Sequence, residues 1–347
     1  MRLKNLRKET RPDLSHKILI NKKKTITAEG EKSLLQILKE NRIFLPSACA
    51  GRGACGMCRC KILSGPGELQ PRELLLLSEG EKKQGVRLAC QTHVTGDMEI
   101  MLPDEFLNAG QFLAEVVSLR NLTYDIKEVL LKLIDPGEIH FKAGQYIQIE
   151  VPPYELCEEG VYRAYSIASS PSCLGNVELE IRFVPNGICT TYVHQHLKTG
   201  DRITINGPHG SFFLRDTDAD IIFIAGGSGM APIKSMLLDM AERGIRRKAM
   251  YLFGARSKKD LFLVEEMQEL EKRLSLFKFI PALSLPQPED RWEGDTGLIT
   301  DVLERHIGSA ENPEAYLCGS PGMINACVKV LKKSCIPEDK IYYDRFA

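Results

Sequence analysis

The chain carries the stretch Cys49-Ala-Gly-Arg-Gly-Ala-Cys55-Gly-Met-Cys58, and a further cysteine follows at Cys90. Three cysteines in one loop with a distant fourth are typical of a plant-type 2Fe–2S site, whose usual run is C-x4-C-x2-C. Here the first gap holds five residues, one more than in that run. We therefore predict that Cys49, Cys55, Cys58 and Cys90 are the ligands of a 2Fe–2S cluster, which moves electrons one at a time.

The glycines of this stretch fit the same interpretation. Gly51, Gly53 and Gly56 permit positive φ values, so that backbone amides can turn toward the sulfurs. Structural zinc sites usually take two short cysteine pairs, and disulfides need an oxidising compartment, for which the sequence shows no secretory signal. Cys60 begins the alternating run Cys60-Lys-Ile-Leu63, and we expect it to be a buried strand residue.

Length and composition limit the possible functions. The 347 residues give room for two or three domains, each with its own core. The 46 basic residues are balanced by 46 acidic residues, which argues against a protein that binds nucleic acid. No apolar stretch approaches the ~18 residues of a spanning helix. Eleven cysteines without a secretory signal indicate a reducing cytosol.

The first residues are locally basic, and Lys22-Lys-Lys24 follows them. We expect a solvated tail at residues 1–15 and a charged hairpin turn, because exposed termini are usually unstructured. The alternative is electrostatic docking of this segment on an acidic membrane surface or partner. The expected location is therefore the cytoplasm, with a peripheral position on the inner face of the cell membrane as the alternative.

Changes in hydrophobic period divide the chain into three further domains. Residues 16–104 are expected to form a ferredoxin-type α+β domain with the β-grasp fold, and residues 111–216 an antiparallel β-barrel of six short strands. Over residues 217–347 strands alternate with helices, which predicts an α/β domain with an open parallel sheet covered on both faces. In the first domain the predicted elements are a hairpin at 17–29, helices near 34–38 and 72–79, and strands at 58–63, 86–91 and 97–102.

The barrel carries a group of residues that fits a flavin. Arg163 offers a forked donor to a pyrophosphate, Tyr165 offers an aromatic face, and Ser166 offers a hydroxyl to an edge nitrogen of the ring. The motif Arg163-Ala-Tyr-Ser166 is weak evidence for a flavin site by itself. The run Gly187-Ile-Cys-Thr-Thr191 that follows it strengthens the prediction.

A helix is expected at 191–197, directly after that run. Thr190 and Thr191 stand where it opens, and its free amides favour a phosphate. With Arg182 as a further cofactor-binding residue, the barrel is predicted to bind FAD.

The third domain opens with an apolar strand that runs into the turn Gly226-Gly-Ser-Gly229 and then into a helix with Pro232 in its first turn. Backbone can approach a pyrophosphate there, and the helix N-terminus faces it. The turn lacks the G-x-G-x-x-G fingerprint, and a packing role for its glycines is the alternative. The residues predicted to bind the nucleotide at this turn are Gly226, Gly227, Gly229, Met230, Ala231 and Pro232.

A later strand ends at Cys318-Gly319 and feeds another helix. Because the carboxyl ends of parallel strands face the ligand crevice, Cys318 and Gly319 are predicted to contact the nicotinamide. A buried structural role is the alternative for Cys318. Phe346 on the last strand is predicted to stack on the flavin where the nicotinamide must come, or else to plug the core. Ser166, Cys318 and Phe346 are therefore the predicted catalytic residues, and hydride transfer needs no strong acid or base beside them.

Together these segments resemble the ferredoxin–NADP reductase superfamily, in the class with an N-terminal ferredoxin domain. The resemblance covers residues 25–347, and within the class the chain is most similar to the F subunits of sodium-translocating NADH:quinone oxidoreductases. The motifs that carry it are the long first gap of the cysteine loop, Leu88-Ala-Cys90-Gln91, Arg163-Ala-Tyr-Ser166, Gly229-Met-Ala-Pro232, Phe253-Gly-Ala-Arg-Ser-Lys258, Pro286-Gln-Pro-Glu-Asp290 and the Asp344/Phe346 ending.

The resemblance implies roles for the residues in these motifs. The four cysteines ligate the cluster, the barrel motif and Thr190 hold FAD, and the glycine turn, Cys318 and Phe346 serve the nicotinamide. Arg256, with Lys258 and Lys259 after it, could contact a 2′-phosphate, which favours NADPH. The same basic stretch belongs to an NADH-using family, so Arg256 is a predicted cofactor-binding residue and NADH the predicted substrate.

The leading hypothesis is an NADH-dependent reductase that passes electrons through FAD and the 2Fe–2S cluster to a redox protein or a quinone. Nicotinamide gives electron pairs and the cluster takes one electron at a time, so the flavin is the necessary middle piece. The F subunits begin with a membrane-spanning helix where this chain has its basic segment. We therefore keep two hypotheses. The chain is a soluble reductase, or it is a peripheral subunit of an ion-translocating complex with membrane subunits as partners. A third hypothesis is an electron carrier or redox sensor without turnover.

Overall fold

The chain forms two compact units, residues 1–109 and residues 110–347. The structure, a computed structural model, describes residues 15–47, 49, 51–65, 67–103, 106–107 and 109–346. Residues 1–14, nearly all of the predicted basic tail, therefore lie outside the described residues. No helix in the described part of the chain is both long and apolar enough to cross a bilayer.

The first unit is a five-stranded mixed sheet in the order β2-β1-β5-β3-β4, with β1 parallel to β5. β1 and β2 form the predicted hairpin. Helix α1 begins where Ser33 and Gln36 exchange the hydrogen bonds of a capping box. The predicted α+β fold is confirmed. The elements are β1 Ser15–Ile20, β2 Lys24–Glu29, α1 Leu34–Glu40, β3 Arg59–Ser64, α2 Pro71–Leu76, α3 Glu79–Lys83, β4 Val86–Leu88 and β5 Met98–Met101.

Two short helices replace the single helix predicted at 72–79. The chain is extended at Leu77, and the Ser78 hydroxyl then accepts a hydrogen bond from the Glu81 N–H and caps a new helix. The strand predicted at 86–91 ends at Leu88, so Cys90 lies in a turn. Cys60 is 3% exposed, which confirms it as a buried strand residue.

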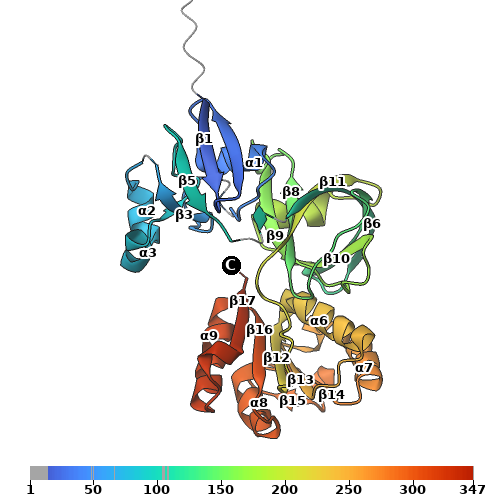
Figure 1. The fold of residues 1–347 in the computed structure, drawn as a ribbon. Helices are drawn as coiled ribbons and strands as arrows, with labels where there is room; N and C mark the ends of the chain where they lie inside the picture. The colour runs from blue at the N-terminus through green and yellow to red at the C-terminus, as the bar shows by residue number, and fades with distance from the viewer. Residues whose placement is uncertain are drawn as a thin grey trace, which may run out of the picture. The chain divides into compact units, whose positions relative to one another are not determined.

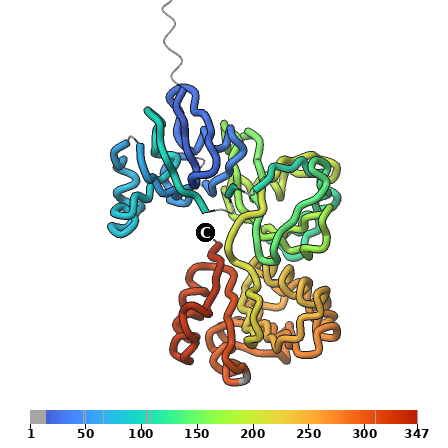
Figure 2. The backbone as a smooth tube through the Cα atoms, in the orientation of Figure 1, coloured from blue at the N-terminus to red at the C-terminus, as the bar shows by residue number. Residues whose placement is uncertain are grey.

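The second unit begins with a six-stranded antiparallel sheet in the order β10-β7-β6-β11-β8-β9. Its edge strands meet at a bridge between Ile167 and Leu179, where the Ala168 N–H donates to the Glu178 carbonyl at 2.8 Å. The sheet therefore curls into the predicted barrel, whose ring can be followed in Figure 2. The strands are β6 Gly110–Asn121, β7 Ile126–Asp135, β8 Tyr146–Val151, β9 Val161–Ser166, β10 Asn176–Arg182 and β11 Arg202–His209.

The helix predicted at 191–197 begins earlier than expected. α5 spans Ile188–Thr191, and a π-helical turn follows at Tyr192–His196. A Cβ on Gly187 would come within 2.5 Å of the Thr190 Oγ1 atom. Gly187 therefore permits the tight entry that starts the helix three residues before the predicted position.

The second unit ends in a six-stranded sheet of parallel strands in the order β15-β14-β13-β12-β16-β17. Phe223 and Ile224, neighbours on β12, pack into different cores, the first with α6 and α7 and the second with α8 and α9. Figure 1 shows these helix pairs on opposite sides of the sheet, as predicted.

The elements of this sheet match the predicted alternation of strands and helices, apart from the short strand β15, which was not predicted. They are β12 Ile221–Gly226, α6 Met230–Arg243, β13 Ala249–Ala255, α7 Val264–Arg273, β14 Phe277–Leu283, β15 Asp295–Thr296, α8 Ile299–His306, β16 Glu314–Gly319, α9 Pro321–Lys333 and β17 Ile341–Arg345.

Candidate functional site

The cysteine loop turns at its glycines, with φ angles of +82°, +68° and +65° at Gly51, Gly53 and Gly56. Glycine alone adopts this region freely. The Ala54 N–H donates to the Cys49 sulfur at 3.3 Å, and the Gly53 amide is hydrogen-bonded to the Cys90 sulfur. Backbone amides therefore point at the sulfurs, as the loop's glycines indicated.

The four thiols lie in two pairs. Cys55 is hydrogen-bonded to Cys49, and Cys58 is hydrogen-bonded to Cys90. The Cys58 thiol lowers the pKa of Cys90, which favours its thiolate even though burial opposes it. Among the described residues no group of three or more His, Cys, Asp or Glu side chains is arranged around a single ion. Two thiol pairs suit the two irons of a 2Fe–2S cluster better than they suit one tetrahedral zinc ion.

A buried ion pair holds the segment that carries Cys90. Arg87 donates to Glu73 through Nε at 2.9 Å and Nη2 at 2.8 Å, and Glu73 is 0% exposed. Glu73 also accepts from the N–H groups of Leu88 and Gln70, each at 2.8 Å. Burial raises the pKa of Glu73, but these donors outweigh it and lower the pKa below its usual value. The pair ties α2 to β4, two residues before Cys90.

Strand β9 presents the predicted flavin residues on two faces. Successive strand residues point in opposite directions, so Arg163 and Tyr165 share one face and Ser166 lies on the other. Tyr165 is hydrogen-bonded to Cys189 of α5, whereas Ser166 is hydrogen-bonded to Asp344 of β17. Arg163 and Tyr165 therefore belong beside α5, and Ser166 faces the last strand of the parallel sheet.

The two predicted threonines lie inside α5. The Thr190 hydroxyl donates to the carbonyls of Val184 and Gly187 at 3.1 and 3.2 Å, and Thr191 is buried. The Thr190 side chain is thus engaged in closing its own loop. A role of either threonine toward FAD stays a prediction.

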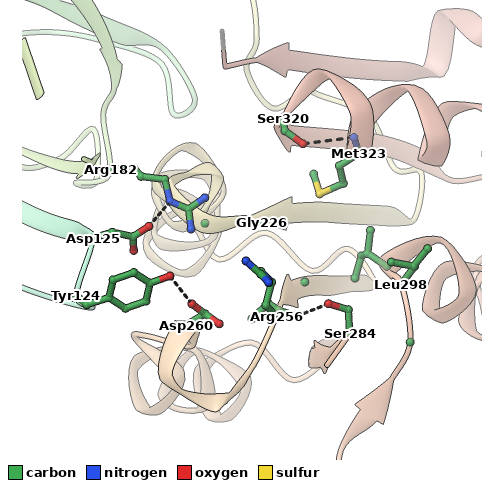
Figure 3. A pocket seen from close by; sticks show the side chains of 15 residues that line it. Tyr124, Asp125, Arg182, Gly226, Arg256, Asp260, Ser284, Leu298, Ser320 and Met323 are labelled. Carbon is green, nitrogen blue, oxygen red and sulfur yellow. Dashed lines mark hydrogen bonds and ion pairs between the residues drawn. The ribbon is translucent and has the colours of Figure 1, made fainter. Parts of the chain in front are cut away.

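A cleft of about 520 Å³ opens at the carboxyl ends of the parallel strands, as Figure 3 shows. It lies where β12 has β13 on one side and β16 on the other, the switch point at which sheets of this kind bind ligands. The predicted residues Arg182, Gly226, Gly227 and Arg256 line it. Further lining residues that were not predicted are Tyr124, Asp125, Asp260, Ser284, Ser320 and Met323.

Arg182 reaches this cleft from the barrel. Its Nε donates to Asp125 at 2.9 Å. Its guanidinium lies so close to Gly227 that a Cβ there would stand 2.7 Å from Nη1. Gly227 also has a φ of +57°. The glycine therefore allows a guanidinium to stand beside the turn, which suits an anionic pyrophosphate.

The rest of the glycine turn is packed inside the sheet domain. Met230, Ala231 and Pro232 are buried at the start of α6. A Cβ on Gly229 would come within 2.3 Å of the Cys318 carbonyl oxygen. Close packing against β16 therefore explains Gly229, and contact of these four residues with a nucleotide stays a prediction.

Cys318 is 0% exposed, and burial raises the pKa of its thiol well above the usual value. It belongs to the same apolar cluster as the partly buried Phe346. The Phe346 N–H donates to the Gly319 carbonyl at 2.9 Å. Cys318 is therefore a buried member of this core, which agrees with the alternative structural role. Contact of Cys318, Gly319 or Phe346 with a nicotinamide stays a prediction.

A second buried charge network joins the barrel to the parallel sheet. Lys234 Nζ contacts Glu178 at 2.7 Å and Glu266 at 3.0 Å. Glu180 is 3% exposed, and neither of its carboxyl oxygens has a hydrogen-bond partner among the described residues. Burial raises the pKa of Glu180 well above its usual value, although Lys234 acts against this. One buried cation therefore lies near three carboxyl groups, and burial raises the pKa of one of them, Glu180.

Three family models match the chain. The 2Fe-2S iron-sulfur cluster binding domain covers residues 18–95, the oxidoreductase FAD-binding domain covers residues 113–214, and the oxidoreductase NAD-binding domain covers residues 223–329. The predicted cofactors, a 2Fe–2S cluster, FAD and NADH, are thereby confirmed as the groups that these domains bind.

Relatives match nearly the whole chain. It is 37% identical over 369 residues to the F subunit of the Na(+)-translocating NADH-quinone reductase of Neisseria meningitidis, with 95% of this chain and 91% of that protein covered. The corresponding protein of Idiomarina loihiensis is 39% identical over 372 residues, with the same coverage.

Solved structures share the fold. The reductase GcoB of Amycolatopsis has a TM-score of 0.78 at 27% identity, with 95% of this chain and 98% of that chain covered. The ferredoxin reductase in carbazole 1,9a-dioxygenase has a TM-score of 0.72 at 27% identity, with 97% and 100% covered.

Proposed function

The chain belongs to the family of Na(+)-translocating NADH-quinone reductase F subunits, within the ferredoxin–NADP reductase superfamily, and we propose that it passes electrons from NADH to a redox protein or a quinone. It is an NADH oxidoreductase built for FAD and a 2Fe–2S cluster. The observation that carries this function is the presence in one chain of two thiol pairs, Cys49/Cys55 and Cys58/Cys90, a flavin-type barrel and a nucleotide cleft. A bound flavin supplies the exchange between the electron pair of a hydride and single electrons.

The residues of the chain have separate tasks in this proposal. Arg182 and the amides beside Gly227 bind the negative charge of the nucleotide. Ser166, held by Asp344, keeps its hydroxyl oriented on the face of β9 that meets the parallel sheet. Arg163 and Tyr165 bind the flavin from the opposite face of the strand. The four thiols hold the cluster in the other unit.

Cofactor content and turnover test the proposal together. Purified protein is expected to be yellow-brown, to contain about one flavin and about two irons per chain, and to reduce ferricyanide with NADH. Iron is measured colorimetrically and flavin by its absorption after release. Colourless protein without iron contradicts the assignment.

A second candidate concerns the partner. We propose as the alternative that the chain is a peripheral subunit of an ion-translocating membrane complex, because the relatives are named as subunits of a Na(+)-translocating enzyme. The first proposal places it in the cytoplasm, whereas the second places it on the inner face of the cell membrane. Retention on membranes after a high-salt wash supports the second, and complete release into the soluble fraction supports the first.

A further inference from the structure

A second cavity extends the nucleotide cleft. It has a volume of about 420 Å³ and shares Tyr124, Arg256 and Asp260 with the first. It lies past the ends of β13 and β14, on the side where sheets of this kind bind the ribose of the adenosine half. A dinucleotide whose pyrophosphate lies at the glycine turn therefore finds room for its adenosine here.

The lysines near this cavity are already engaged. The Lys258 N–H donates to Asp290 Oδ2 at 3.4 Å, and Lys258 Nζ donates to the Asp290 carbonyl at 3.2 Å. Lys259 Nζ lies 5.6 Å from the centroid of the Tyr124 ring. Of the three basic residues that the sequence suggests for a 2′-phosphate, Lys258 and Lys259 thus interact with other groups of the protein.

One wall of the cavity is acidic. Glu289 and Asp290 line it from the turn Pro288–Asp290, which follows β14. The Asp290 carboxylate accepts the Gln287 N–H at 2.8 Å, which holds it in place at the turn. The wall therefore presents two carboxylates that belong to a short, hydrogen-bonded turn.

A third carboxylate, that of Asp260, lines the same cavity. Asp260 accepts the N–H and the hydroxyl of Ser257, each at 2.8 Å, and the Tyr124 hydroxyl at 3.0 Å. Against these three acids, only Arg256 and Lys259 bring positive charge to the lining. The cavity is therefore acidic on balance, although basic residues dominate the sequence next to it.

We propose that Glu289 and Asp290 exclude the 2′-phosphate of NADPH and thereby set the preference of this chain for NADH. A phosphate with nearly two negative charges meets two carboxylates here, whereas the neutral 2′-hydroxyl of NADH can donate a hydrogen bond to one of them. The inference rests on the proposed function, because it states which nucleotide that function's cleft rejects.

The test compares the holoprotein with its Glu289→Gln variant and with the double variant Glu289→Gln/Asp290→Asn. Glu293→Gln is the matched control, because Glu293 is an exposed acid that lines neither cavity. Calorimetry measures the dissociation constants of ADP and of adenosine 2′,5′-bisphosphate. Stopped flow measures the second-order rate constants of flavin reduction by NADH and by NADPH.

The double variant is expected to bind adenosine 2′,5′-bisphosphate about 10-fold more tightly, while its affinity for ADP changes by less than about 2-fold, because only the phosphate meets the removed charges. The NADPH/NADH ratio of rate constants should rise by the same factor, and the single variant should show part of the effect. The Glu293→Gln control should match the wild type.

Unchanged ratios in both variants overturn the inference, and so does an equal change in the control, which reports a general effect of surface charge. If NADH reduces the flavin in the same samples, the proposed function is supported even when either of these results overturns the inference. If neither nucleotide reduces the flavin, the proposed function fails, and the two calorimetric constants still decide the inference.

Discussion

Each of the two units of this chain buries a network of acidic and basic side chains. The pKa of the buried acid Glu73 is lowered in the first network, whereas the pKa of the buried acid Glu180 is raised in the second. In residues 1–109 one acid meets one base, and Glu73 receives donors from Arg87 and from two backbone amides. In residues 110–347 Lys234 contacts Glu178 and Glu266 and lies near Glu180, whose oxygens receive no donor from the described residues. Hydrogen-bond donors therefore lower the pKa of Glu73 in spite of burial, whereas burial without such donors raises the pKa of Glu180.

The difference matches what each unit does. The balanced pair fixes the segment before Cys90, where a cluster ligand must keep its position. The unbalanced network lies between the barrel and the parallel sheet, where Glu178 and Glu180 of β10 face Lys234 of α6. Stability should therefore depend on pH through both networks. It should fall through Glu73 as the pH drops toward the lowered folded pKa of that group, and it should fall through Glu180 as the pH rises above the unfolded pKa.

The largest effect is expected from Arg87→Ala. It leaves the Glu73 carboxylate buried without its partner, which costs about 3–5 kcal/mol of the free energy of unfolding. Cluster absorbance followed through urea unfolding measures this loss, and iron content should fall with it. Lys32→Ala is the control, because its exposed pair with Glu40 is worth less than about 1 kcal/mol. Equal stabilities of the two variants would contradict the role of the pair.

A smaller loss, about 2 kcal/mol, is expected from Lys234→Met. The variant leaves three carboxyl groups without their cation, but these groups can take up protons and so reduce the cost. The loss should therefore be larger at pH 8 than at pH 5. Thermal unfolding at the two pH values measures it. A loss that does not depend on pH indicates that packing of the lysine, and not its charge, stabilises the network.

Glu180→Gln should stabilise the protein as pH rises. Burial raises the pKa of folded Glu180, so the unfolded chain, with a pKa of about 4.3, ionises first. Between that value and the folded pKa the wild type loses stability by at most about 1.4 kcal/mol per pH unit. Glutamine cannot ionise and avoids the loss. The free energy of unfolding of the variant, minus that of the wild type, should increase from pH 4 upward. A difference that does not change with pH would contradict a raised pKa of Glu180 in the folded protein.

The smallest effect on folding is expected from Ser166→Ala, at about 1 kcal/mol for one lost hydrogen bond to Asp344. Flavin reduction by NADH should nevertheless slow, by about 10-fold, because the hydroxyl is predicted to orient the ring. Stopped flow at saturating NADH measures the rate, and the iron signal should stay intact. Phe346→Ala serves as the comparison at the other predicted ring contact, and wild-type rates in both variants count against those roles.

The sequence predicts the first unit's site better than the second's, because that site is local. The three loop cysteines and their glycines lie within ten positions, and turn geometry follows directly from Gly51, Gly53 and Gly56. In the second unit Ser284 and Ser320 follow strand ends, where the rule for parallel sheets could have placed them. Tyr124 comes from a barrel hairpin and gives no such signal.

Glu180 shows why the sequence alone could not predict the buried charge network of the second unit. Strand alternation sets Leu179 and Ile181 in the barrel core and directs Glu180 outward, which predicts exposure. Helix α6, which begins fifty positions later in the chain, brings Lys234 near that face, and Glu180 is buried in the folded protein. The alternative role of Cys318 as a core residue has the same cause, since only the assembled sheet decides which strand ends stay open.

Anaerobic titration with NADH, followed by flavin absorbance and low-temperature electron paramagnetic resonance, tests the central claim most directly. The account predicts that NADH bleaches the flavin and that the same samples develop the paramagnetic signal of a reduced 2Fe–2S cluster. If NADH bleaches the flavin while the iron becomes paramagnetic only with dithionite, the proposed electron route is contradicted. If no iron signal develops with either reductant, the four thiols do not hold the cluster.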